Sequence, residues 1–294
     1  MHKYMRAIGF SKPIKRQKQE ELIEEVLEYP RNTSYTSGPG NNVLVEYCKD
    51  FAENMGIAVC GEYDEDENFT VDYFYPYLRG RDVSSYEDVS VERHAEKESY
   101  AGVCDDIKVG VSLIFYLQNI IPYVNAHTRD LLPICGTTLT LSALSIQGCV
   151  ILPIVKNEKE MQKVKKAAMN RNQLIAAARQ GDEDAIESLT LEDMDTYTSI
   201  SKKILTEDVF SLVDTYFMPY GVECDQYSIL GEILDFSVTE NRITGEKIYL
   251  MKISCNDLQF DLCINTEDLY GEPQVGRRFK GVIWMQGYIN YPDI

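Results

Sequence analysis

A chain of 294 residues is longer than a typical single domain, so two or three structural units are expected. Its 47 acidic and 29 basic residues give a net charge of −18, which argues against binding to nucleic-acid phosphates or anionic lipid. Hydrophobic residues make up 44% of the chain, enough to bury a sizeable core.

The first 18 residues hold six Lys and Arg and no acidic residue, a composition that raises the question of a targeting peptide. The segment lacks the continuous apolar core and the small-residue cleavage site of a secretory signal. The most apolar stretch, VGVSLIFYLQNIIPYVNA, is interrupted by Gln118, Asn119 and Pro122 and is too polar to span a membrane as a helix. We therefore expect a soluble cytoplasmic protein with no membrane partner.

The cysteines and histidines predict no metal site. Eight cysteines are scattered without a CxxC pair, which is typical of reduced thiols rather than of a disulfide framework. His2, His94 and His127 are far apart in the sequence, and no zinc-ligand spacing is present. No nucleotide-binding glycine pattern or GxSxG motif appears either, so no cofactor is expected.

Residues 1–155 are predicted to form an α+β domain built on an antiparallel sheet. One helix is expected before Pro30: Ser11 can cap its start, and the apolar residues between 22 and 27 form its packed stripe. The sequence RNTSYTSGPGNN that follows is expected to be a turn-rich loop.

The rest of the first unit is rich in Val, Ile, Phe and Tyr, with turn residues between short runs. Short spacings favour antiparallel hairpins over parallel βαβ units. The stretches with β-character are VLVEYC, GIAVCGEY, FTVDYFYPYL, SYAGVC, VGVSLIFYLQNIIPYVNA and LTLSALSIQGCVILPIV.

Residues 156–225 change in composition and are expected to be a helical segment. Gly181 is typical of a helix stop, Asp182 of the next N-cap, and Thr190 of a further helix start. Thr206 can cap one more helix. We expect consecutive short helices with tight turns, and their carboxylates argue against a DNA-reading helix–turn–helix.

Residues 226–294 return to β-structure and predict a small C-terminal barrel, OB-like or SH3-like. The four expected strands lie in YSILGEILDFSV, GEKIYLMKIS, LQFDLCI and RRFKGVIWMQGYI. Gly231, Gly281 and Gly287 stand where a barrel strand must bend. One helical turn is expected at TEDL.

The last predicted strand carries the candidate ligand or interface contacts. Arg278, Lys280, Trp284 and Tyr288 alternate onto one face, and cations beside rings are typical of single-strand nucleic-acid binders. Residues 226–294, however, hold ten acids and six bases, which opposes phosphate binding. Packing of Trp284 and Tyr288 against another part of the chain is therefore favoured.

The acidic stretch DEDENFTVD partly copies a calcium-binding loop. Asp64, Asp66 and Asn68 take the first, third and fifth positions of an EF-hand loop. Phe69 and Tyr75 stand where that loop needs a glycine and a bidentate glutamate. An acidic hairpin tip is favoured over a cation site.

Two further patterns contain residue types that could take part in chemistry. His94 and Cys104 can form a nucleophilic pair only if the fold brings them together, and no local motif supports the pair. In YFYPYL, strand alternation sends Tyr73, Tyr75 and Tyr77 to one face. Packing at the edge of the core is favoured there over a contact patch, because tyrosine is commonly half-buried.

Several segments together resemble a known protein family. They are MHKYMRAIGFSK, SLTLEDMDTYTSISKKI, FMPYGVECDQYSILGEI and GRRFKGVIWMQGYI. The chain resembles, over nearly its full length, a family of similar length from clostridial Firmicutes that is catalogued as a domain of unknown function. The resemblance implies a bacterial cytoplasmic origin and carries over no catalytic residue.

Three functions remain open from the sequence. The preferred one is a non-enzymatic scaffold that binds another protein or a second copy through its acidic, tyrosine-rich surface, including Asp64, Asp66 and Glu67. The alternatives are a nucleic-acid or nucleotide binder using the barrel, and an enzyme of unrecognised type with strongly shifted carboxylate or thiol pKa values in a cleft. The preference depends on one expectation, that no reactive groups lie side by side.

Overall fold

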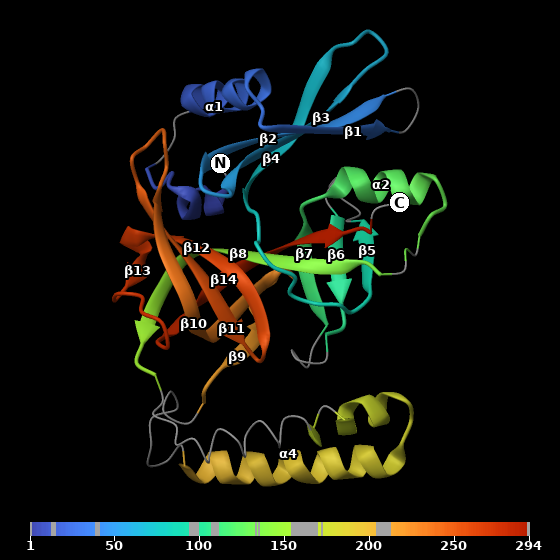
Figure 1. The fold of residues 1–294 in the computed structure, drawn as a ribbon, viewed down its shortest axis with the longest axis vertical. Helices are drawn as coiled ribbons and strands as arrows, with labels where there is room; N and C mark the ends of the chain where they lie inside the picture. The colour runs from blue at the N-terminus through green and yellow to red at the C-terminus, as the bar shows by residue number, and fades with distance from the viewer. Residues whose placement is uncertain are drawn as a thin grey trace.

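The computed structural model describes residues 2–12, 16–38, 42–93, 100–106, 112–132, 134, 136–153, 170–171, 173–203 and 213–292. Its strands form two β-sheets (Figure 1). Sheet A is antiparallel and consists of β1 (Asn32–Ser37), β2 (Val43–Ala52), β3 (Met55–Tyr63) and β4 (Phe69–Leu78), in that spatial order. The fold is α+β with an N-terminal antiparallel sheet, as the sequence predicts.

Five strands of sheet B close into a small barrel: β8 (Thr138–Ile151), β10 (Gln226–Glu240), β11 (Lys247–Cys255), β12 (Leu258–Asn265) and β14 (Arg278–Asn290). The ring closes because β14 pairs antiparallel with both β10 and β8, and β12 pairs in parallel with β8. The four strands predicted between residues 226 and 294 are all present. The fifth, β8, lies within residues 1–155, which the sequence predicts to be a separate N-terminal unit.

Sheet B continues beyond the barrel. β14 pairs with β7 (Leu113–Leu117), which leads on to β6 (Tyr100–Cys104) and β5 (Val89–Arg93). Two short strands, β9 (Tyr216–Pro219) and β13 (Leu269–Tyr270), pair with β10 and β8. The barrel and its three-strand extension therefore form one continuous hydrogen-bonded sheet.

The helical elements are η1 (Lys3–Ile8), α1 (Arg16–Glu28), α2 (Ile120–Thr128), α4 (Glu183–Lys203) and the turn η2 (Thr266–Asp268). In Figure 1, α1 covers one face of sheet A, α2 lies against the other, and α4 lies apart from both sheets. No helix in the described part of the chain has the length and apolar character needed to cross a membrane.

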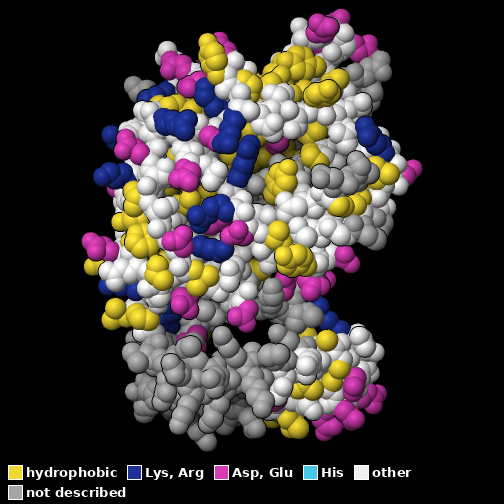
Figure 2. Space-filling view, viewed as in Figure 1, with side chains coloured by type: hydrophobic (Ala, Val, Ile, Leu, Met, Phe, Trp, Pro, Cys, Tyr) yellow, Lys and Arg dark blue, Asp and Glu magenta, His cyan; other side chains and the backbone are white. Residues whose placement is uncertain are grey.

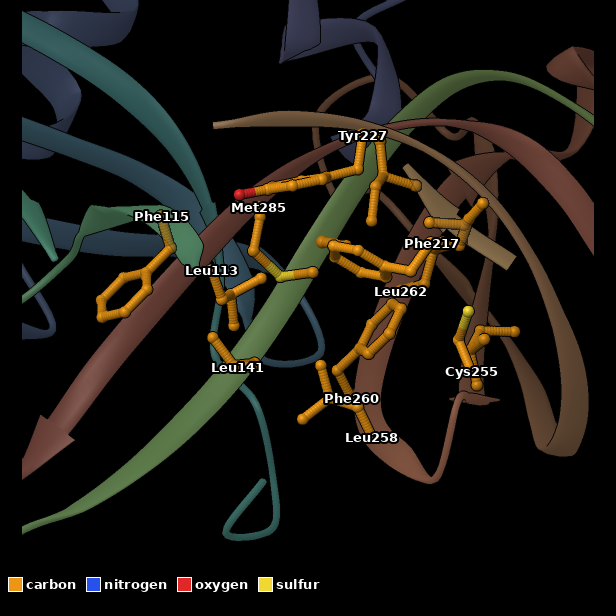
Figure 3. Close-up of a cluster of buried hydrophobic side chains, with 14 of the residues drawn as sticks. Leu113, Phe115, Leu141, Phe217, Tyr227, Cys255, Leu258, Phe260, Leu262 and Met285 are labelled. Carbon is orange, nitrogen blue, oxygen red and sulfur yellow. The ribbon is translucent and has the colours of Figure 1, made fainter. Parts of the chain in front are cut away.

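The barrel interior is an apolar core (Figure 3). Phe279, Ile283 and Met285 of β14 are fully buried there, as the alternation of the last predicted strand requires. Gly148 faces the Phe279 ring, and a Cβ added at this glycine would lie 2.4 Å from a ring carbon. The glycine therefore allows the ring to pack closely against β8.

A second core lies outside the barrel, between the barrel wall and sheet A. The η1 segment fills it with Tyr4, Met5 and Ile8, all fully buried. Asn241 of the β10–β11 turn donates to the Ile8 carbonyl at 2.7 Å, and Arg6 pairs with Asp268. The N-terminal segment is therefore anchored to the barrel by both packing and polar contacts.

The structure corrects three local predictions. Residues 32–37, expected in a loop, form β1, because pairing with β2 compensates for their low strand propensity. Ile120–Thr128, expected in a β-rich stretch, is α2, with Pro122 in its first turn. Thr190 lies inside the continuous helix α4 and donates to the Ile186 carbonyl, so no new helix begins there.

Other local predictions are confirmed. Gly181 has a left-handed φ of 89°, and Asp182 accepts from the Ala185 N–H at 3.1 Å at the start of α4. α1 ends at Glu28, before Pro30. Ser11, however, donates its hydroxyl hydrogen to Glu246 at 2.7 Å. Thr206, proposed as a cap, lies outside the described residues.

Candidate functional site

The four contact residues predicted on β14 do not form one exposed surface. Trp284 is 4% exposed; its ring stacks on Tyr4 at 5.2 Å, and its N–H donates to Asp225 at 2.6 Å. Arg278 is 6% exposed and donates to main-chain carbonyls, with Leu152 at 2.9 Å. Lys280 is partly exposed and Tyr288 is 42% exposed. Two of the four side chains are thus engaged inside the protein.

The acidic stretch after β3 is a hairpin tip. The Asp64 carboxylate accepts from the main-chain N–H groups of Asp66 at 2.9 Å and Asn68 at 2.8 Å, which closes the turn. Glu67 takes the left-handed φ of 62° that the turn requires. Within the residues that the structure describes, no group of three His, Cys, Asp or Glu side chains could hold a metal ion.

The weighed pair of His94 and Cys104 gains no support. Cys104 is fully buried, and burial raises the pKa of its thiol to about 11, so the thiol stays protonated at neutral pH. His94 lies outside the described residues. The cysteines among the described residues are free thiols.

The candidate site is a cleft between sheet A and α2. Alternation along β2 turns Leu44, Glu46 and Cys48 toward α2, and alternation along β4 turns Tyr75 and Tyr77 the same way. α2 packs across β1 and β2, and the Thr36 hydroxyl of β1 donates to Asn125 of α2 at 2.7 Å. Sheet A therefore has a helix on each face, and the α2 side retains two cavities.

Cavity I has a volume of about 330 Å³, and its walls include Leu44, Tyr73, Ile120, Ile121 and Val124. Cavity II has a volume of about 320 Å³, and its walls include Asn32, Ser34, Arg79, Gln118, Asn119 and Asn290. Glu46 lines both cavities, so the two adjoin at its side chain. Each lies within the size range of small-molecule sites.

Glu46 is the central polar group of the cleft. It is 8% exposed; its carboxyl oxygen lies 2.8 Å from the Tyr75 hydroxyl and 3.7 Å from the Cys60 sulfur. Burial away from water raises the pKa of Glu46 to about 7, against the lowering effects of Tyr75, Cys60 and Arg79. The carboxyl group is therefore divided between its neutral and charged forms at neutral pH.

Hydrogen counting favours the neutral form. The Tyr75 oxygen also lies 3.1 Å from the Gln118 carbonyl, but a hydroxyl carries a single hydrogen. Tyr75 can donate to Gln118 and still bond Glu46 only if Glu46 is protonated and donates to the Tyr75 oxygen. The chain of bonds Glu46–Tyr75–Gln118 is complete in that state.

The thiols of the cleft are not nucleophiles at neutral pH. Burial raises the pKa of Cys48 to about 12 and that of Cys60 well above its ordinary value. Burial likewise raises the pKa of Tyr75 far above the physiological range. Glu46 is consequently the one group among these four that changes its protonation near neutral pH.

Arg79 gives cavity II a positive charge. Its guanidinium lies over the Tyr77 ring at 5.1 Å from the ring centre. Within the described part of the chain, no carboxylate lies at ion-pair distance from Arg79. The neighbouring Arg81, in contrast, is neutralised by Asp261 at 2.6 Å. In Figure 2, Lys and Arg side chains gather over the junction of sheet A and the barrel, with Asp and Glu among them.

The cleft overturns the expectation that no reactive groups lie side by side, because Glu46, Cys60 and Tyr75 converge in a buried hollow. The same-face arrangement of the β4 tyrosines was predicted, and Tyr75 and Tyr77 are buried. Glu46 was missed. The usable signal was its alternation with Leu44 and Cys48 in VLVEYC, which places a carboxyl on an otherwise weakly polar strand face.

Comparison with known proteins gives one match. Residues 5–287 match the model of the family described as "Domain of unknown function, E. rectale Gene description (DUF3881)". The match spans both sheets, the cleft and the barrel. No curated protein and no solved structure matches the chain.

Proposed function

Because the chain belongs to the DUF3881 family, whose function is unknown, we propose its function from the cleft itself: it binds a small organic molecule between sheet A and α2. The observation that carries the proposal is the position of Glu46. A nearly buried carboxyl with a raised pKa costs folding free energy, and it stands between two cavities of ligand size.

The lining of the cleft is typical of a ligand-binding cavity rather than of a packing defect. Apolar walls in cavity I supply burial for a hydrocarbon group, and a few fixed polar groups in cavity II supply orientation. The polar groups are themselves held in place: Gln118 donates to the Leu78 carbonyl and to Gln286, both at 2.8 Å. Preorganised walls of this kind lower the entropic cost of binding.

The test uses 1-octanol, an uncharged molecule whose size suits cavity I. Isothermal titration calorimetry of the full chain should show saturable binding. Val124→Trp, which fills cavity I from α2, should remove it. The matched control is His127→Trp, which places the same side chain on the exposed side of α2 and outside the lining of cavity I. This variant should bind 1-octanol as the wild type does. Absence of saturable binding of both 1-octanol and octanoate by the wild type would contradict the proposal.

A second candidate, binding of another protein, is favoured by the exposed acidic tip of the β3–β4 hairpin. Asp64, Asp66 and Glu67 are exposed there, and the tip projects beyond the body of the molecule in Figure 1. Charge reversal at the three positions should abolish capture of a protein partner from a cell extract. Wild-type and reversed chains that capture the same proteins would exclude this surface as the contact.

A further inference from the structure

The two cavities of the cleft differ in the chemistry of their walls. On its α2 side, cavity I is lined by three apolar residues, Ile120, Ile121 and Val124, and by Thr128 at the end of the helix. Cavity II is lined largely by amides and hydroxyls, together with the Glu46 carboxyl group and the guanidinium groups of Arg79 and Arg81. A ligand that occupies both must therefore carry a hydrocarbon part and a polar part on one molecule.

The charge of the polar part follows from Arg79. Asp261 neutralises Arg81, whose guanidinium donates twice to the carboxylate, at 2.6 and 3.1 Å. Arg79 has no such partner among the residues described, although it is half-buried beside the Tyr77 ring. Glu46 adds no full negative charge while it is protonated. The local balance of cavity II is thus positive in a chain of net charge −18.

We propose that the ligand of the cleft is an amphipathic carboxylate, with its anionic group on Arg79 in cavity II and its apolar body in cavity I. The inference rests on the proposed binding function and names the ligand class. A guanidinium offers two parallel N–H groups that match the two oxygens of a carboxylate. A carboxylate carries one negative charge, which matches Arg79, the one arginine of cavity II without a carboxylate partner among the described residues, whereas a phosphate dianion carries two charges.

Glu46 fits this arrangement because its neutral form lies between the two parts of the ligand. Protonated Glu46 carries no charge, so it does not oppose the burial of a hydrocarbon chain beside it. An anion on Arg79 also removes the effect by which that guanidinium lowers the Glu46 pKa, so ligand binding and retention of the Glu46 proton support one another. The proton and the ligand are then bound cooperatively.

The experiment compares octanoate with 1-octanol by calorimetry at a pH where octanoate is ionised. The wild type should bind octanoate about tenfold or more tightly than the alcohol, as expected for a charge-assisted hydrogen bond. Arg79→Gln should lower octanoate affinity to that of the alcohol, and the readout is the ratio of the two affinities in this variant against the ratio in the wild type. Arg79→Lys should keep part of the preference, and Arg129→Gln, an exposed cation outside both cavities, should keep all of it.

The outcomes separate this inference from the proposed function. Equal affinity for octanoate and 1-octanol in the wild type, or an octanoate preference that survives Arg79→Gln, overturns the carboxylate assignment while leaving small-molecule binding intact. Tighter binding of octyl phosphate than of octanoate also overturns it. Failure of the wild type to bind any of the three compounds removes the proposed function together with the inference.

Discussion

Inside the barrel, Phe279, Ile283 and Met285 are buried among other apolar side chains, whereas the face of sheet A toward α2 buries Glu46 and Tyr75. Apolar burial in the barrel removes hydrocarbon surface from water and stabilises the fold. Burial of a carboxyl group opposes folding unless its hydrogen bonds are complete. The contrast indicates that apolar burial in the barrel stabilises the fold, whereas the cleft gives up stability for a polar, cavity-containing site.

The largest expected effect comes from a substitution in the apolar core of the barrel. Phe279→Ala should lower the free energy of unfolding by about 3–5 kcal/mol, because it removes a fully buried ring and leaves a cavity against Gly148. Urea denaturation would measure the change. The control Val238→Ala, at an exposed site of β10, should change stability by less than about 0.5 kcal/mol. A loss at Phe279 no larger than that control would refute an apolar barrel core as the main source of stability.

The next effect concerns the junction between the two regions. Arg81→Met should cost about 3 kcal/mol, because Asp261 on β12 is 4% exposed and would lose its ion pair. Lys252→Met removes the neighbouring pair with Asp82, whose carboxylate is exposed, and should cost less than about 1 kcal/mol. Denaturation of both variants measures the difference. Equal losses would mean that burial of Asp261 does not set the strength of the pair.

The third prediction concerns the cleft, where a substitution should raise the free energy of unfolding instead of lowering it. Glu46 keeps its proton up to about pH 7 in the folded protein, but its ordinary pKa is 4.5, so the folded state binds more protons between these values. The free energy of unfolding therefore falls as pH rises from 4.5 to 7, by up to about 3 kcal/mol for full ionisation. Glu46→Gln cannot titrate and should exceed the wild type by about 2 kcal/mol at about pH 8.

The cysteine and tyrosine side chains that face Glu46 do not titrate within the pH range of this measurement. Burial raises the pKa values of Cys48, Cys60 and Tyr75 above the tested range. Denaturation curves of wild type and Glu46→Gln at several pH values should therefore converge near the acid end of the range. Parallel curves with a constant offset would show that Glu46 does not carry a raised pKa.

The smallest effect tests the contact between the barrel wall and the N-terminal segment. Asp225→Asn weakens the hydrogen bond from the Trp284 indole N–H and should cost about 1 kcal/mol. Because the chain has one tryptophan, its fluorescence reports this site alone. The emission should shift in the folded variant, and an unchanged spectrum together with unchanged stability would contradict the role of Asp225.

Local patterns predicted much of the fold. The barrel strands from residue 226 onward and the face shared by Tyr75 and Tyr77 follow from side-chain alternation, which holds whatever a strand pairs with. The polar strand β1 was mistaken for a loop because its stability comes from the register with β2. α2 was not predicted, because its β-branched residues favour a strand and outweigh Pro122, which is typical of the first turn of a helix.

The cleft could not be predicted, because it is made by contacts between distant segments. The sequence places Glu46 on a strand, but only the packing of α2 on sheet A decides which strand face loses water. In the sequence, Arg79 likewise cannot be distinguished from a surface arginine. Only the structure shows that Asp261 pairs with the neighbouring Arg81 and not with Arg79. The candidate contacts Arg278 and Trp284 drew attention by composition, and their burial also depends on long-range contacts.

The position of β8 (Thr138–Ile151) near the middle of the chain has a consequence for biosynthesis. β8 leaves the ribosome well before β10, β12 and β14, yet it hydrogen-bonds to β12 and β14. Sheet A can form from contiguous hairpins during translation, while the ring must wait for its final strand. A fragment starting at residue 226 would present β12 and β14 as two unpaired edges, and such edges invite association between nascent chains.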